Sequence, residues 1–133
     1  KTGREFTKSF YKKPSRFVIG LANDNMAKAW SFDRLNDQPV VNDQFAGEPI
    51  LVLFNTESGS AHIYSRKLGG EVLQFSRQGN EIVDESGTKW IPETGIAKSG
   101  PWERRELKQL PAIPSFKSSW QSFYPDSEFW NPH

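Results

Sequence analysis

Polar side chains gather at the ends of three consecutive predicted strands in the middle of the chain. Asn42 and Asp43 lie near the end of the first strand, and Asn55 follows the second. Arg66 follows the third, next to Ser65, and could reach back to Asp43 as a charge-assisted pair. Two interpretations are open: a pocket in which Arg66 orients an anionic group and Asp43 a hydroxyl, or a structural pair that fixes a loop.

A second pattern pairs Asp43 with Asp84 and Glu85, which end another predicted strand. Two carboxylates held within a few ångströms of each other raise the pKa of one of them and supply an acid and a base. The alternative, which we favour, is that Asn42 and Asp43 bond to loop backbone, as turn residues do. An enzyme that acts on a small substrate through Asp43 is therefore the second function class that the sequence allows.

Metal and nucleophile chemistry has little support in the sequence. The chain has no cysteine, which excludes disulfides, thiolate zinc sites, iron–sulfur clusters and thiol nucleophiles. Its two histidines, His62 and His133, lack the spacing of a metal-binding pair. Ser60, after Gly59, lacks the flanking residues of a nucleophile elbow. We expect no bound metal, no cofactor and, on balance, no catalysis.

The chain holds five tryptophans, many for its length. A β-domain with few aliphatic residues needs most of these side chains in its core. Trp102 is the least easily buried, because Gly100 and Pro101 precede it and charged residues follow it. We therefore include Trp102 among the candidate ligand-binding residues, as a ring that could stack on a sugar or another planar ligand.

A hairpin at residues 50–65 must position the polar residues. Residues 50–54 (ILVLF) form a continuous apolar run, which is typical of a strand buried on both faces. Residues 55–60 (NTESGS) are turn formers, and residues 61–65 alternate between two faces as a strand does. We expect residues 50–54 to be the central strand, between residues 61–65 and a strand at residues 40–45.

Turn residues recur along the chain about every 8–12 residues, the spacing of an antiparallel sandwich or barrel. One helix is predicted near the C-terminus. Ser115 is a good N-cap, and Pro125 would end the helix. An apolar stripe between them consists of Phe116, Trp120 and Phe123 with Tyr124. The sequence thus predicts an all-β fold, mainly an antiparallel sandwich or barrel, with one C-terminal α-helix.

Charge is nearly balanced over the 133 residues, with 17 basic and 16 acidic side chains, so no overall field favours nucleic acid. Residues 1–16 differ, because six basic residues against one acid give them a net charge of +5. We expect residues 1–15 to be a basic N-terminal arm or linker, which contacts phosphates or a membrane surface or, the favoured interpretation, is solvated. A single β-rich domain is expected over residues 16–133.

Ordered motifs along the chain resemble the bacterial and archaeal domain-of-unknown-function family numbered 3179. In the first half they are residues 18–21 (VIGL), 28–30 (KAW), 34–35 (RL), 41–43 (VND) and 47–50 (GEPI). In the second half they are Asp84, Ser86, Gly87, Thr88 and Trp90, then Thr94, Gly95, Ala97, Gly100 and Pro101, then Leu107, Leu110 and Pro111, and finally Trp120, Phe123, Pro125 and Asp126. The resemblance covers about residues 16–130.

This resemblance implies little biochemistry, because the family has no assigned activity. Many members stand behind a leader or lipid anchor, which implies an extracytoplasmic location and membrane proximity through a missing N-terminal segment. A chain that starts at Lys1 agrees with a trimmed or removed leader. The family's usual Tyr-Cys-Pro-x-Cys stretch is replaced here, with Asn55 and Ser58 at the cysteine positions. Thiol chemistry of relatives is therefore absent from this chain.

Together these observations favour a non-catalytic binding or interaction module outside the cytoplasm. Its partner is expected to be a small molecule or a protein, and not nucleic acid. The candidate ligand-binding residues are Asn42, Asp43, Asn55, Arg66 and Trp102.

Overall fold

A computed structural model describes residues 16–132 of the chain. The chain forms two compact units. The terminal unit comprises Lys1–Pro39, Phe54–Ala61 and Pro111–His133, as far as these are described, and the inner unit comprises Val40–Leu53 and His62–Leu110. The predicted basic arm at residues 1–15 lies outside the described residues, and a single domain over residues 16–133 stays a prediction.

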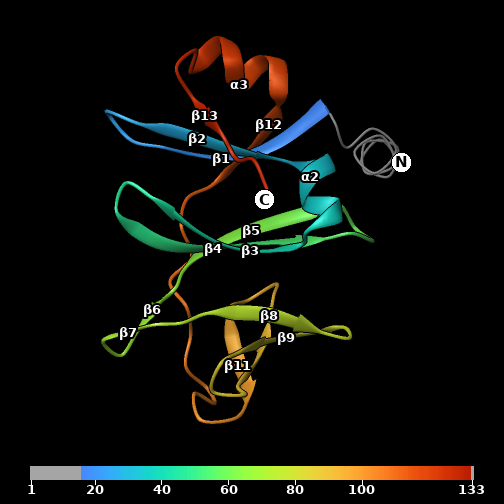
Figure 1. The fold of residues 1–133 in the computed structure, drawn as a ribbon, viewed down its shortest axis with the longest axis vertical. Coiled ribbons are helices and arrows are strands. Elements are labelled where there is room, and N and C mark those ends of the chain that lie inside the picture. The colour runs from blue at the N-terminus through green and yellow to red at the C-terminus, as the bar shows by residue number, and fades with distance from the viewer. Residues whose placement is uncertain (1–15, 133) are drawn as a thin grey trace. The chain divides into compact units, whose positions relative to one another are not determined.

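The secondary structure is mainly β, with several antiparallel sheets and one C-terminal helix, as the sequence predicts. Figure 1 shows the order of the elements. The elements are β1 (Phe17–Ala22), β2 (Ala27–Ser31), α2 (Phe32–Asp37), β3 (Val40–Phe45), β4 (Glu48–Asn55), β5 (Ser60–Ser65), β6 (Lys67–Leu68), β7 (Glu71–Val72), β8 (Phe75–Gln78), β9 (Glu81–Asp84), β10 (Lys89–Ile91), β11 (Ile96–Ser99), β12 (Ile113–Phe116), α3 (Lys117–Phe123) and β13 (Glu128–Phe129). No helix among the described residues has the length and apolar character needed to cross a membrane.

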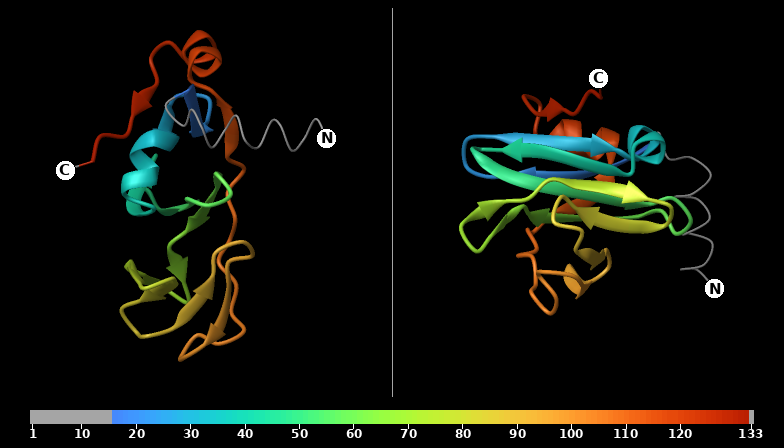
Figure 2. Two further views of the ribbon diagram at one scale, coloured as in Figure 1. Left: turned by 90° about the vertical axis from the view of Figure 1, so that its right-hand side faces the viewer. Right: turned by 60° about the horizontal axis from the view of Figure 1, so that its bottom comes forward.

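The terminal unit is built on a four-stranded sheet with the order β12-β1-β2-β13. β1 pairs antiparallel with β2 and with β12, whereas β13 runs parallel to β2. The turn between β1 and β2 is fixed by Asn23, whose side-chain oxygen accepts the N–H groups of Asn25 and Met26, each at 2.8 Å. Figures 1 and 2 both show α3 lying over one face of this sheet.

Helix α3 is held on the sheet by Trp120, which is buried against Gly20 of β1. A Cβ atom at Gly20 would lie 2.3 Å from the Trp120 ring, so a side chain at this position would displace the helix. The absence of a side chain at Gly20 therefore lets the Trp120 ring pack closely against β1.

The predicted start of this helix is wrong. Ser115 is not the N-cap, because it belongs to β12 and pairs with Val18 of β1. Phe116, the residue before the helix, is extended and pairs with Phe17. The predicted apolar stripe is also reduced, since Phe123 is 82% exposed. Pairing with a strand far away in the sequence therefore overrides the local capping preference.

The inner unit contains the predicted central strand. β4 lies between β3 and β5 in a three-stranded sheet, which confirms the prediction for residues 50–54. A second sheet has the order β11-β10-β9-β8. The core of this unit consists of Leu51, Leu53, Tyr64, Leu68, Leu73, Phe75, Ile82, Trp90, Ala97 and Leu107. These side chains come from both sheets, from the segment between them and, in the case of Leu107, from the segment after β11.

Candidate binding site

The side chain of Arg66 donates several hydrogen bonds within the inner unit. Its side chain is buried, at 6% exposure, directly after β5. Its Nε donates to the carbonyl of Ile50 at 2.8 Å, and its Nη1 donates to the carbonyl of Leu73 at 2.9 Å. Nη1 also donates to the Gln74 side chain at 3.2 Å, and Nη2 donates to the main-chain carbonyl of Asp43 at 2.9 Å. One guanidinium thus joins β3, β4 and the segment before β8.

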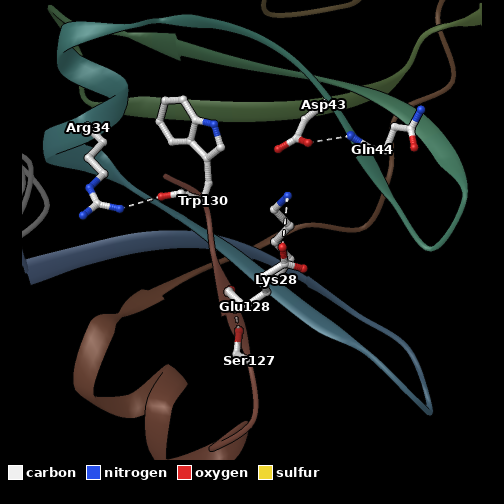
Figure 3. A network of polar contacts seen from close by, with 7 residues as sticks. All are labelled: Lys28, Arg34, Asp43, Gln44, Ser127, Glu128 and Trp130. Atoms are coloured by element: carbon white, nitrogen blue, oxygen red, sulfur yellow. Dashed lines mark hydrogen bonds and ion pairs between the residues drawn. The ribbon is translucent and has the colours of Figure 1, made fainter. Parts of the chain in front are cut away.

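The predicted Arg66–Asp43 contact therefore exists, but through the main chain of Asp43. The Asp43 carboxylate itself accepts the N–H of Gln44 at 2.7 Å, as Figure 3 shows. Burial lowers the pKa of Arg66 from its ordinary value, while the charges of Asp43 and Glu85 act in the opposite direction. A guanidinium committed to carbonyl groups favours the structural interpretation, and the anion pocket stays a prediction.

Replacing Asp43 by asparagine tests whether the contact with Arg66 is made by the main chain of Asp43 or by its carboxylate. The variant keeps the carbonyl that Arg66 uses, so we expect the free energy of unfolding to fall by less than about 1 kcal/mol. Urea unfolding followed by tryptophan fluorescence measures the difference. A loss as large as that of an Arg66 variant would show that the carboxylate carries the contact.

Asn42 and Asn55 have separate structural roles. The Asn42 side chain donates to the carbonyl of Phe75 at 2.8 Å and accepts its N–H at 2.9 Å, so it links β3 to β8 as a strand residue would. The Asn55 side chain accepts the N–H groups of Glu57 and Ser58 at 2.9 and 3.1 Å. Asn55 belongs to the terminal unit and Asn42 to the inner unit. Both amides bond to backbone, as turn-forming and strand-linking residues do.

Trp102, the remaining candidate, is partly buried against the core of the inner unit. The guanidinium of Arg105 lies 5.3 Å from its ring centroid, within the range of a cation–π contact. Gly69 also approaches the ring, since a Cβ there would lie 3.0 Å from it. Arg105 and Gly69 of the same unit therefore contact the Trp102 ring. Ligand stacking on Trp102 stays a prediction.

Asp84 organises a partly buried polar network that the sequence did not reveal. Its carboxylate accepts the indole N–H of Trp90 at 2.9 Å, and the N–H of Ser86 at 2.7 Å. The Ser86 hydroxyl also donates to this carboxylate and lies 2.8 Å from the hydroxyl of Thr88. Thr88 in turn accepts the N–H of Trp102 at 3.1 Å. Asp84, Ser86, Thr88 and Trp90 are among the residues that carry the family resemblance. Here they tie the β9–β10 turn to the core.

The geometry does not favour the predicted acid–base pair. The carboxylate of Asp84 is 4% exposed and accepts bonds from Trp90 and Ser86. Glu85 accepts the N–H of Gln74 at 3.2 Å. In the part of the chain that the structure describes, no group of three or more His, Cys, Asp or Glu residues could hold a metal ion. His62 stacks on Tyr64, with ring centroids 6.2 Å apart.

Tyr64 is a buried titratable group in the core of the inner unit. Its side chain is fully buried, and its hydroxyl donates to the carbonyl of Pro92 at 2.7 Å. Burial and, to a smaller extent, the charges of Glu93 and Glu106 raise the pKa of Tyr64 to about 12. The folded protein therefore holds the phenol neutral at a pH where the unfolded chain ionises.

This shift predicts a pH dependence. The contribution of Tyr64 to stability is fully present below the ordinary pKa of about 10 and is lost as the pH rises from about 10 to about 12. Comparing urea unfolding of the wild type and Tyr64→Phe isolates this contribution, because other titrating groups cancel. The difference between the two unfolding free energies should change over that pH range, in favour of the variant. A constant difference would contradict the prediction.

An open groove lies in the terminal unit, and we call it the Phe123 groove. It has a volume of about 360 Å³ and lies between the β1–β2 turn and the segment that joins α3 to β13. Its lining residues are Asn23, Asp24, Asn25, Met26, Ala27, Phe123, Tyr124, Pro125, Asp126, Ser127 and Glu128. Met26 is 45% exposed and Phe123 is 82% exposed. None of the predicted site residues lines it. Its two walls are far apart in the sequence, so no local sequence pattern indicates the groove.

The wall at β13 is fixed by polar contacts shown in Figure 3. Arg34 donates to the carbonyl of Trp130 at 2.7 Å, and Lys28 Nζ lies 3.9 Å from the carboxylate of Glu128. Ser127 donates to the carbonyl of Glu128 at 3.0 Å. These contacts hold the short strand beside β2 and give the groove a defined wall.

Comparison with known proteins gives one family. The family model described as "Protein of unknown function (DUF3179)" matches residues 7–127. No curated protein and no solved structure matches the chain.

Proposed function

The chain belongs to the DUF3179 family of proteins of unknown function, and on this premise we propose that it is a non-catalytic binding module that takes its ligand in the Phe123 groove. The proposal places the protein outside the cytoplasm, near a membrane. Support for that location is the resemblance to family members that stand behind a leader or lipid anchor.

The observation that carries the proposal is the contrast between buried and exposed groups. Arg66 would be needed for an anion pocket and Asp84 for an acid–base pair. Both side chains are buried and form hydrogen bonds within the inner unit. The Phe123 groove instead offers exposed apolar side chains, Met26 and Phe123, next to the exposed acids Asp24 and Asp126. Exposed aromatic side chains beside convergent polar groups are typical of a ligand site.

The test is a screen of small molecules, peptides and oligosaccharides by amide NMR on the full chain. Ligands should shift the amides of residues 23–28 and 123–128. Phe123→Ala should weaken such binding about tenfold or more, with a change in unfolding free energy within about 0.5 kcal/mol. Val72→Ala, which removes an exposed apolar side chain of the inner unit, is the matched control.

Two results would overturn this proposal. Ligands that shift only amides of the inner unit would place the site elsewhere. Turnover of a bound compound that Asp43→Asn abolishes would favour the alternative, an enzyme acting on a small substrate.

A further inference from the structure

The Phe123 groove is negatively charged. Three exposed acids line it, Asp24, Asp126 and Glu128, and its lining contains no lysine or arginine. Lys28, which is not part of the lining, forms a loose ion pair with Glu128: its Nζ lies 3.9 Å from the carboxylate, and the side chain of Glu128 stays 65% exposed. Like charges in one groove repel each other, and a cationic ligand relieves that repulsion.

Aromatic rings lie beside these carboxylates. The ring of Tyr124 lies 4.5 Å from that of Trp120 and 5.9 Å from that of Phe123, centroid to centroid. Phe123 and Tyr124 line the groove, whereas Trp120 is buried and supports them from outside the lining. The face of an exposed aromatic ring attracts lysine and arginine. Met26, on the opposite wall, adds a flexible apolar contact. The groove can therefore hold a cation and an apolar group side by side.

The wall of the groove also includes an edge strand. β13 ends the strand order β12-β1-β2-β13 and contributes Glu128 to the lining. An extended peptide can bind along the edge of a sheet while its side chains enter neighbouring pockets. A volume of about 360 Å³ suits a short segment with few side chains.

We propose that the Phe123 groove binds a cationic peptide segment of a partner protein, in which lysine or arginine alternates with aromatic or aliphatic residues. This inference rests on the proposed function and names the ligand class of the same groove. The basic side chains pair with Asp24 and Asp126, and an apolar side chain packs on Phe123. A neutral sugar would use the rings but would leave the carboxylate repulsion unrelieved.

The experiment titrates the full chain with three blocked pentapeptides, Ala-Lys-Phe-Lys-Ala, Ala-Gln-Phe-Gln-Ala and Ala-Glu-Phe-Glu-Ala, and with maltohexaose. Amide NMR reports where each probe binds. We expect the lysine peptide to shift residues 23–28 and 123–128, and to bind about tenfold or more tightly than the glutamine peptide. Raising the salt concentration from about 20 to about 200 mM should weaken the binding of the lysine peptide several-fold.

Charge variants complete the test. Asp24→Asn combined with Asp126→Asn should weaken binding of the lysine peptide about tenfold. Both residues are exposed, so the fold should be retained, which a thermal melt checks. The matched control, Glu93→Gln combined with Glu103→Gln, removes two exposed charges from the inner unit and should leave the affinity unchanged.

The outcomes separate the two proposals. Equal binding of the glutamine peptide or of maltohexaose in the groove would overturn the cationic class and leave the proposed function standing. Binding of the lysine peptide outside the groove, or with no dependence on Asp24 and Asp126, would also overturn it. If no probe and no compound of the wider screen shifts the amide signals of residues 23–28 and 123–128, both the cationic-peptide proposal and the proposed function are overturned.

Discussion

Replacing Arg66 by methionine should lower the free energy of unfolding by about 3–5 kcal/mol. Methionine fills much of the same space but donates no hydrogen bonds. The carbonyls of Ile50 and Leu73 would lose a charged donor inside the inner unit, and so would that of Asp43. Each buried carbonyl left without a partner costs about 1–3 kcal/mol, so the losses accumulate even though hydrophobic area is retained.

Thermal and urea unfolding of Arg66→Met and Arg66→Lys measure the effect. Lysine keeps the charge but lacks the planar guanidinium that can donate to three carbonyls at once. The loss of unfolding free energy in Arg66→Lys should therefore be close to that in Arg66→Met. The control is Arg77→Met, because Arg77 is exposed and donates to the carbonyl of Gly79 within its own turn. Similarly small losses of unfolding free energy in the Arg66 and Arg77 variants would contradict a structural role for Arg66. They would favour the interpretation of Arg66 as part of an anion pocket.

Replacing Asp84 by alanine should lower the free energy of unfolding by about 3–4 kcal/mol. The indole N–H of Trp90 would lose its acceptor in the core, and the N–H of Ser86 would lose its acceptor in the turn. The Ser86 hydroxyl would also lose its partner, which leaves only the contact with Thr88. Because the network fixes the β9–β10 turn, the variant should loosen this turn before the rest of the unit unfolds.

Two measurements check this result. Urea unfolding gives the loss of stability, and the indole N–H signal of Trp90 in a proton NMR spectrum should move or broaden. Asp126→Ala, which removes an exposed carboxylate, is the control and should cost less than about 0.5 kcal/mol. An unchanged Trp90 signal, with a stability close to wild type, would refute the role of this network.

Local patterns predicted the elements that local interactions determine. The apolar run at residues 50–54 gave the central strand β4, because such a run can be buried only between two neighbours. The start of α3 was missed, because Phe116 pairs with Phe17, a partner that no local window contains. Arg66 was expected near Asp43, but the sequence could not show that the acceptor is a main-chain atom.

The Phe123 groove could not be predicted for the same reason. Its walls, residues 23–27 and 123–128, meet only because β13 pairs with β2 in parallel. A two-residue strand such as β13 has no periodicity of its own. Motif residues such as Asp84 and Trp90 were visible in the sequence, but their hydrogen bonds required the folded turn.

The discontinuous terminal unit has a consequence for biosynthesis. Strands β8 to β11 of the inner unit pair with their neighbours in sequence, so this sheet can form as soon as they leave the ribosome. β1 must wait for β12, and β2 must wait for β13. During that interval the apolar strand Phe17–Ala22 lacks one of its partners. A chaperone that recognises unpaired strands would therefore meet β1 first and would be released once β12 has been made.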